Sequence, residues 1–379
     1  MTSGTLTGRD PATGAPLAVT YADGVITAIT PGPADARGFL APGLVDLQVN
    51  GFLGHDLNSG ALTPETVVAL SDAMLADGVT CYLPTLITAS EASLIAGLRA
   101  IVAARRADPR LIRMIPGVHV EGPWLSPEDG ARGAHPRQHV RAPDLAEFDR
   151  WQEAAEGLVR KVTLSPHWPL TPEVVEGLVA RGVLVAIGHT HASPDEITAA
   201  FDAGATLSTH LGNGAAATLP RHPNLIWTQL SEDRAMAGLI ADGHHLPAAT
   251  FKAMLRAKGQ DRVYLVSDVA APGGLPPGTY AQPIGGTVEL SADGRLSLKG
   301  TPYLAGAALP LKACVARAAT MASIPLAEAL MLATRNPGRL VGDYGRLEIG
   351  APADLIRFDW SEGDGDLRLD TVLLGGVAA

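Results

Sequence analysis

The sequence alternates between short β-type segments and helical segments, and this order constrains the fold more than any other feature. The β-type runs cover residues 43–51, 80–88, 113–123, 159–168, 184–190, 206–211, 235–245 and 262–270. Apolar residues at helical spacing mark the intervening segments 63–77, 90–107, 144–156, 171–181, 194–203 and 247–258, several of which begin with a Ser, Thr or Asp cap. Eightfold strand-helix alternation is typical of an α/β fold of the (β/α)₈ barrel type. We therefore predict such a barrel over residues 43–342.

The two ends of the chain do not follow this pattern. Residues 1–42 and 343–379 contain short strand-like pieces separated by turn residues. We expect them to meet in one small β-sandwich domain. A further hairpin at 286–300 follows the eighth strand, and helices between about 309 and 339 are expected to close the barrel.

Composition and charge exclude several classes of protein. A net charge of -10 and a pI near 5.5 give no basic surface for nucleic acid. No stretch approaches eighteen uninterrupted apolar residues, so no membrane span is expected. The N-terminus lacks the features of a secretory signal, and Cys81 and Cys314 are too few for a disulfide framework. We expect a cytoplasmic protein with two reduced, buried thiols.

Polar residues stand at the ends of most predicted strands. Catalysis in (β/α)₈ barrels takes place at these carboxyl ends. The residues found there are Gln48, Asn50, Glu121, His167, His189, His210, His244, His245 and Asp268. One inward histidine is commonly a structural residue, but several on separate strands favour a shared site.

Three of these residues form a set of two histidines and one glutamate. Glu121, His189 and His210 match a known catalytic zinc arrangement that leaves a fourth position open for water. We expect one divalent ion, Zn²⁺, with Fe²⁺, Mn²⁺ or Co²⁺ as alternatives for the same ligands. Asp268 ends the eighth strand, where it is a candidate to accept a proton from the water. The alternative for Asp268 is a turn or helix-capping role.

Several motifs resemble a known family of enzymes. APGLVDLQVNG resembles the first strand of the amidohydrolase superfamily, except that Gln48 and Asn50 replace the usual His-x-His pair. HVEGPW, GAHP, IGHTHAS, THLGNGA, ADGHH, VSDVAAPGG and GRLEIGAPADLIRFD are similar, in order and spacing, to the N-acetylglucosamine-6-phosphate deacetylase family. The resemblance covers essentially the whole chain.

The resemblance implies a role for each matching residue. Glu121, His189 and His210 would bind the metal, Asp268 would be the general acid and base, and His135 would contact the acetyl carbonyl. Substrate contacts would come from Asn213, Gly214, Arg221, His245, Leu304, Ala305 and Gly306, with Arg221 on the phosphate and His245 on a sugar hydroxyl. The Gln48 and Asn50 amides imply a single metal, with both side chains contacting the ligands or the substrate.

The family implies a metal-dependent hydrolase that converts N-acetyl-D-glucosamine 6-phosphate to glucosamine 6-phosphate and acetate. It also suggests a homodimer with the Arg221 loop near the interface. The segments LGNGAAA and SPHWPL depart from the family, so a galactosamine epimer or an unphosphorylated sugar stays an alternative substrate. A barrel that has lost catalysis and serves as an interaction protein is a second alternative.

The remaining histidines receive no catalytic role. Structural or exposed positions are expected for His55, His119, His139 and His222. His167 and His191 lie near the mouth of the predicted barrel, and we assign them no function.

Overall fold

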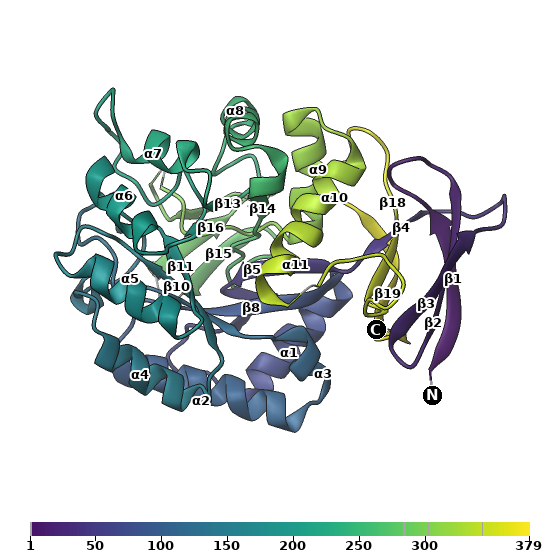
Figure 1. The fold of residues 1–379 in the computed structure, drawn as a ribbon, viewed down its shortest axis with the longest axis horizontal. Helices are drawn as coiled ribbons and strands as arrows, with labels where there is room; N and C mark the ends of the chain where they lie inside the picture. The colour runs from purple at the N-terminus through teal and green to yellow at the C-terminus, as the bar shows by residue number, and fades with distance from the viewer. Residues whose placement is uncertain (1, 283–285, 302, 343) are drawn as a thin grey trace.

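A computed structural model describes residues 2–282, 286–301, 303–342 and 344–379. In these ranges a parallel sheet of eight strands curls into a nearly closed barrel, with the order β14-β13-β12-β11-β10-β9-β8-β5 (Figure 1). The strands are β5 (Leu44–Val49), β8 (Val79–Ile87), β9 (Val118–Glu121), β10 (Val159–Leu164), β11 (Leu184–Ile187), β12 (Leu207–Ser208), β13 (Met236–Leu239) and β14 (Val263–Leu265). A parallel bridge between Val49 and Val269 joins the first strand to the segment after the last. The predicted fold class is confirmed.

Helices surround the barrel on its outside (Figure 1). They are α1 (Pro64–Ala76), α2 (Glu91–Ala107), α3 (Arg110–Met114), α4 (Leu145–Ala154), α5 (Thr171–Ala180), α6 (Pro194–Asp202), α7 (Leu225–Ser231), α8 (Ala248–Lys258), α9 (Leu311–Ala322), α10 (Leu326–Leu332) and α11 (Arg335–Val341). Side-chain caps begin several of them, as the sequence predicts. Ser90 accepts a hydrogen bond from the Ser93 amide, and Ser193 forms a capping box with Glu196.

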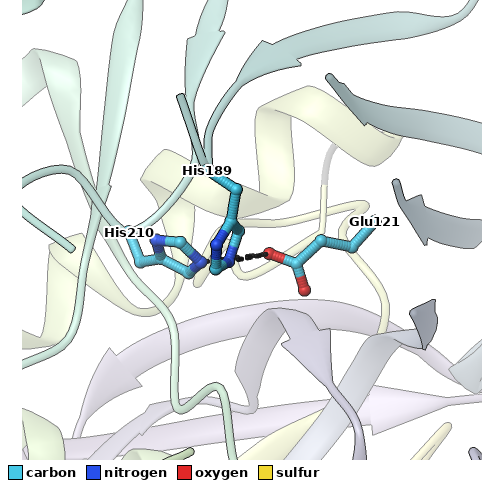
Figure 2. A group of neighbouring side chains, drawn as sticks. All are labelled: Glu121, His189 and His210. Carbon is cyan, nitrogen blue, oxygen red and sulfur yellow. Dashed lines mark hydrogen bonds and ion pairs between the residues drawn. The ribbon is translucent and has the colours of Figure 1, made fainter. Parts of the chain in front are cut away.

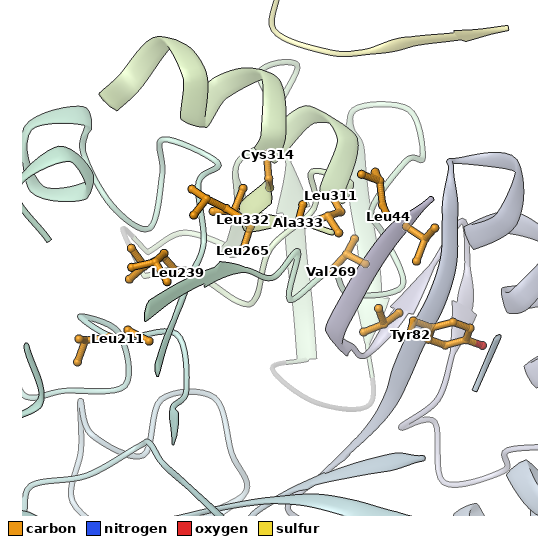
Figure 3. Packing of buried hydrophobic residues seen from close by; sticks show 14 of the residues in the cluster. Leu44, Tyr82, Leu211, Leu239, Leu265, Val269, Leu311, Cys314, Leu332 and Ala333 are labelled. Atoms are coloured by element: carbon orange, nitrogen blue, oxygen red, sulfur yellow. The ribbon is translucent and has the colours of Figure 1, made fainter. Parts of the chain in front are cut away.

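The hydrophobic core has two layers because each strand has an outer and an inner face. The outer layer lies between strands and helices, and Figure 3 shows α9 packing Leu311 and Cys314 near Leu265 of β14. The inner layer fills the barrel with residues that include Val45, Leu83 and Leu207, each fully buried. The barrel interior is therefore packed.

Strands from both chain ends join in one seven-stranded sheet beside the barrel, with the order β20-β19-β18-β4-β1-β2-β3. The strands are β1 (Ser3–Arg9), β2 (Pro16–Ala22), β3 (Val25–Pro31), β4 (Phe39–Pro42), β18 (Leu355–Asp359), β19 (Arg368–Leu374) and β20 (Val377–Ala378). The antiparallel pairing of β4 with β18 brings the two ends together. Residue 343, where the second part of this domain was predicted to begin, lies outside the described residues.

Several element boundaries differ from the sequence prediction, and in two places the elements themselves change. The predicted strand at 113–123 is helical at its start, in α3, and β9 begins only at Val118 after Pro116 and Gly117. The predicted hairpin at 286–300 gains a third strand: β15 (Gly278–Gln282), β16 (Gly286–Leu290) and β17 (Leu296–Leu298) form a small antiparallel sheet. No helix of the described chain is long and apolar enough to cross a membrane.

Candidate active site

Three side chains converge at the mouth of the barrel. Glu121 ends β9, while His189 and His210 lie two residues beyond the ends of β11 and β12. Both imidazole Nε2 atoms approach the same oxygen, Glu121 Oε1, at 3.5 Å from His189 and 3.0 Å from His210 (Figure 2). All three residues are buried, and their ligand atoms lie within 4.8 Å of one another. The group could hold a metal ion.

The hydrogen bonds of this group set which nitrogen of His189 faces Glu121. His189 Nδ1 lies 3.0 Å from the Ala131 carbonyl oxygen, which can only accept a hydrogen bond, so Nδ1 carries a proton and Nε2 is the nitrogen that an ion would take in exchange for a proton. Burial opposes a charge on this ring, but the hydrogen bond and charge of Glu121 outweigh it and raise the pKa of His189. Burial opposes ionisation of Glu121, but hydrogen bonds from His189 and His210 outweigh it and hold its pKa well below the usual range. The site therefore offers two imidazole nitrogens and a carboxylate, the donor set of a zinc-type centre.

Three of the site residues have an unusual backbone conformation that orients their side chains. His189, His210 and Asp268 have φ angles of 47°, 29° and 53°, in the left-handed region that few residues other than glycine adopt. Each follows the end of a barrel strand, so the turn directs the side chain across the mouth. Such conformations cluster at functional sites because the surrounding structure must hold them in place.

Two amides of the first strand hold the two carboxylates of the site. Gln48 Nε2 donates to Glu121 Oε1 at 3.0 Å, and Asn50 Nδ2 donates to Asp268 Oδ1 at 2.8 Å. Burial raises the pKa of Asp268, and the nearby charge of Glu121 raises it further. A carboxyl with a raised pKa holds a proton more readily, which suits general acid and base chemistry.

His135 faces the same space from the loop after β9. Its Nε2 lies 3.3 Å from His189 Nε2, and its Nδ1 lies 2.9 Å from the Thr88 hydroxyl oxygen. Burial, followed by the charge on His189, lowers the pKa of His135 to about 3, so its ring is neutral. A neutral, buried imidazole at this position can donate one hydrogen bond to a bound carbonyl.

Comparison with known proteins agrees with this geometry. Residues 39–379 match the model of the amidohydrolase family. The chain belongs to the amidohydrolase family. It is 32% identical over 354 residues to an N-acetylgalactosamine-6-phosphate deacetylase of Escherichia coli O157:H7, covering 89% of each chain. It is 34% identical over 336 residues to the human N-acetylglucosamine-6-phosphate deacetylase, covering 84% of this chain and 79% of the relative.

A solved structure extends the match over the complete fold of this amidohydrolase. An N-acetyl-D-glucosamine-6-phosphate deacetylase from Mycobacterium smegmatis, an aspartate-to-alanine variant bound to N-acetyl-D-glucosamine-6-phosphate, superimposes with a TM-score of 0.88. The two chains are 29% identical, and the match covers 100% of this chain and 99% of the other. The family resemblance expected from the sequence motifs is confirmed.

The loop after β12 brings two further predicted residues to the group of Glu121, His189 and His210. Asn213 Nδ2 donates to the His210 carbonyl oxygen at 3.2 Å. Gly214 has a φ of +57°, and a Cβ built on it would lie 2.8 Å from His189 Nδ1. Only glycine fits there, because a side chain would push against the imidazole.

The remaining predicted substrate residues come from three other segments of the chain. His245 follows β13, and its Nδ1 is bonded to Asp242 Oδ2 at 2.6 Å. The loop of Leu304, Ala305 and Gly306 runs beside the segment after Asp268, since the Ala270 amide donates to the Ala307 carbonyl. Arg221 is exposed, and no contact within the described residues joins it to the metal group. Its predicted role on a phosphate stays a prediction.

Sequence reasoning missed the residues that support the ligands. Thr88, the Ala131 carbonyl and Asp242 each bond a histidine of the site. The Asp-Gly-His-His sequence after β13 carried one available signal, because an aspartate at such a turn commonly accepts hydrogen bonds from the amides that follow it. The Ala131 contact had no signal, since any residue supplies a backbone carbonyl.

Of the histidines left without a role, His55 and His139 are half-buried and His222 is exposed. His119 is fully buried below the ligands, with ring nitrogens 3.2 Å from Thr85 Oγ1 and 2.7 Å from Thr163 Oγ1, and this is a structural position as expected. His167 and His191 pack against each other with ring centroids 4.4 Å apart, and they bond Ser165 and Ser126 respectively.

Proposed function

We propose that this amidohydrolase removes the acetyl group from N-acetyl-D-glucosamine 6-phosphate and releases glucosamine 6-phosphate and acetate. One observation carries the proposal: a buried group of two imidazoles and a carboxylate lies at the mouth of the barrel beside a second carboxylate, Asp268. Relatives and a solved structure that bear this activity in their names match nearly the whole chain.

The proposed cofactor is one divalent ion per chain, Zn²⁺ in the first instance, held by Glu121, His189 and His210. The donor set fits the ion, because the Ala131 carbonyl holds Nδ1 of His189 and leaves Nε2 facing Glu121, and Gln48 donates a hydrogen bond to that carboxylate. An ion there would supply Lewis acidity toward the acetyl carbonyl and lower the pKa of water. Gln48 and Asn50 are poorer ligands than histidines, and this supports a single ion.

The chain's own residues would handle the protons and the developing charge. His135 would donate from its ring to the carbonyl oxygen as negative charge builds on it. Asp268 would take a proton from the attacking water and return it to the amine nitrogen, which leaves readily only when protonated. The hydrogen bond from Asn50 orients Asp268 for both transfers.

Acetate release from a panel of sugars tests the proposal. The panel consists of N-acetylglucosamine and N-acetylgalactosamine, each with and without a 6-phosphate, assayed with zinc-loaded protein. We expect the highest kcat/KM for N-acetylglucosamine 6-phosphate. Absence of acetate from all four sugars at full metal content would reject the proposal and favour an inactive barrel.

The galactosamine epimer is the second candidate substrate. It is favoured by the relative from Escherichia coli O157:H7, which is named for the galactosamine compound and covers 89% of this chain. The same panel separates the two epimers. Arg221 is the proposed phosphate contact for either, and loss of Arg221 should raise KM only for the phosphorylated sugars.

Three further features are proposed from the resemblance. The enzyme would be a homodimer with the Arg221 loop near the interface, and it would act in the cytoplasm, where buried free thiols such as Cys81 and Cys314 are common. Its small domain would comprise residues 1–42 and 343–379 and its catalytic barrel residues 43–342. The shared seven-stranded sheet supports this division.

A further inference from the structure

The turn after β13 contains a buried carboxylate that the proposed chemistry does not use. Asp242 is 1% exposed, and three hydrogen bonds end on its two oxygens. Oδ1 accepts from the backbone amides of His244 and His245, both at 2.8 Å, and Oδ2 accepts from His245 Nδ1 at 2.6 Å. One carboxylate therefore shapes the turn and holds the imidazole that the turn presents.

Only one nitrogen of the His245 ring is left for a ligand. The side chain is 8% exposed, and Nδ1 is engaged by Asp242. Nε2 makes no hydrogen bond to the described residues, yet it is not among their sealed, unpartnered polar atoms. Solvent therefore reaches Nε2. Burial opposes a charge on the ring, but the hydrogen bond and charge of Asp242, followed by the charge of Asp268, outweigh it and raise the pKa of His245.

Two contacts fix the turn from outside. Arg317 of α9 donates from Nη1 to the Asp242 carbonyl oxygen at 2.7 Å. His244 Nε2 donates to the Asp293 carbonyl oxygen at 3.0 Å, which ties the turn to the loop between β16 and β17. Asp242 is bonded at both its backbone carbonyl and its side-chain carboxylate. Its carboxylate oxygens are therefore fixed in position relative to the His245 ring.

We propose that Asp242 is a positioning residue for substrate binding, which orients His245 so that Nε2 faces the bound amino sugar. An ionised carboxylate can only accept, so it keeps the proton of the neutral ring on Nδ1 and leaves Nε2 as an acceptor for a sugar hydroxyl. The inference rests on the proposed function, because it assumes that His245 meets the sugar.

Asparagine at position 242 would reverse this arrangement. Its carbonyl oxygen can still accept from the two backbone amides, so the turn keeps its shape. Its amide group would then face His245 Nδ1 and donate to it, which moves the proton of the neutral ring to Nε2. Asp242→Asn therefore moves the proton of the His245 ring while the turn keeps its fold.

A double-mutant cycle tests whether Asp242 acts through His245. We expect Asp242→Asn to raise KM for N-acetylglucosamine 6-phosphate roughly tenfold, the size of one lost hydrogen bond, with kcat within a few-fold of the parent. In a His245→Ala background the same substitution should add nothing. An equal loss in both backgrounds would overturn the proposal and leave Asp242 as a structural residue.

A second measurement needs no substrate. Nitrogen NMR of the zinc-loaded parent, at a pH where the ring is neutral, reports the tautomer of His245, and His245→Ala identifies its signals. We expect the Nδ1–H form in the parent and the Nε2–H form in Asp242→Asn. The Nε2–H form in the parent would overturn the proposal. If the sugar panel fails while the Nδ1–H form is found, the proposed function falls and the orientation of His245 by Asp242 stands.

Discussion

Asp268 differs from the other carboxylate of the site in what surrounds it. Glu121 is bonded by two imidazoles and an amide, and its pKa is held low. Asp268 receives one side-chain hydrogen bond, from Asn50, and burial raises its pKa. Environments that push two neighbouring carboxyl groups apart in pKa assign them different tasks. Here the low-pKa group suits a permanent ligand, and the raised group suits proton transfer.

Replacing Asp268 with asparagine should therefore separate chemistry from binding. Asparagine has nearly the same shape and keeps a hydrogen-bonding group, but it cannot take a proton from water. We expect kcat to fall by ~10²–10⁴ with KM within a few-fold of the parent, because the lost interaction belongs to the transition state. Steady-state kinetics at matched metal content measure this. Turnover within a few-fold of the parent would make Asp268 a turn residue and direct attention to His135.

The loop after β12 shows how a segment without regular structure is shaped by one side chain. Gly214 packs its Cα against the imidazole of His189, and its φ of +57° also disfavours other residues. Gly182 has a similar φ of +75° but nothing within 4 Å of a built Cβ. Replacing either glycine with another residue strains the backbone, but only a side chain at position 214 would also clash with a neighbour.

Gly214→Ala should weaken metal binding, whereas Gly182→Ala should not. Each substitution is expected to lower the free energy of unfolding by about 1 kcal/mol through the backbone. Only alanine at 214 would also displace His189, so we expect at least a tenfold rise in the Kd for Zn²⁺. Competition with a zinc-binding dye measures Kd. Equal affinities for the two variants would show that the loop yields to the extra methyl group.

Strand β5 carries a carboxyl group below the site that couples stability to pH. Asp46 is fully buried, and burial raises its pKa to about 7, although it accepts hydrogen bonds from the amides of Gln48 and Ser267. The folded chain then binds this proton more tightly than the unfolded chain. Its contribution to stability is complete below the unfolded pKa near 4 and is lost as the pH rises through 7.

Asp46→Asn should remove this part of the pH dependence. Asparagine does not titrate. Between pH 5 and pH 8 the free energy of unfolding of the parent should therefore fall by roughly 2–3 kcal/mol relative to that of the variant. Urea unfolding of the metal-free proteins at both pH values measures the difference. A constant gap between parent and variant would mean that Asp46 does not change its charge in this range.

At the scale of the whole molecule, the sequence predicts those parts of the fold that depend on repeating patterns. Strand-helix alternation identifies the barrel, and barrel geometry then brings residues as distant as Glu121 and His210 to one mouth. Short apolar runs were ambiguous, since Met114 and Ile115 read equally well as strand or helix, and the structure begins β9 later. The Asp242 contact depends on the orientation of a ring, which a linear pattern does not record.

The same convergence would make a bound metal a cross-link of the barrel. Glu121, His189 and His210 come from β9 and from the turns after β11 and β12, so an ion bound to all three joins three separate strands. The unfolded chain cannot hold these residues together. An ion that binds only the folded state stabilises it by an amount that grows with the concentration of free ion relative to Kd.

Removing the ion should therefore lower the stability of the whole protein. At free Zn²⁺ a hundredfold above Kd, we expect the free energy of unfolding to exceed that of the chelator-treated protein by about 2.7 kcal/mol. Metal analysis should give one ion per chain. Glu121→Gln removes a ligand with little change in size, so its stability should respond far less to added Zn²⁺. If zinc stabilises this variant as much as the parent, the ion acts elsewhere on the molecule and these three residues are not its ligands.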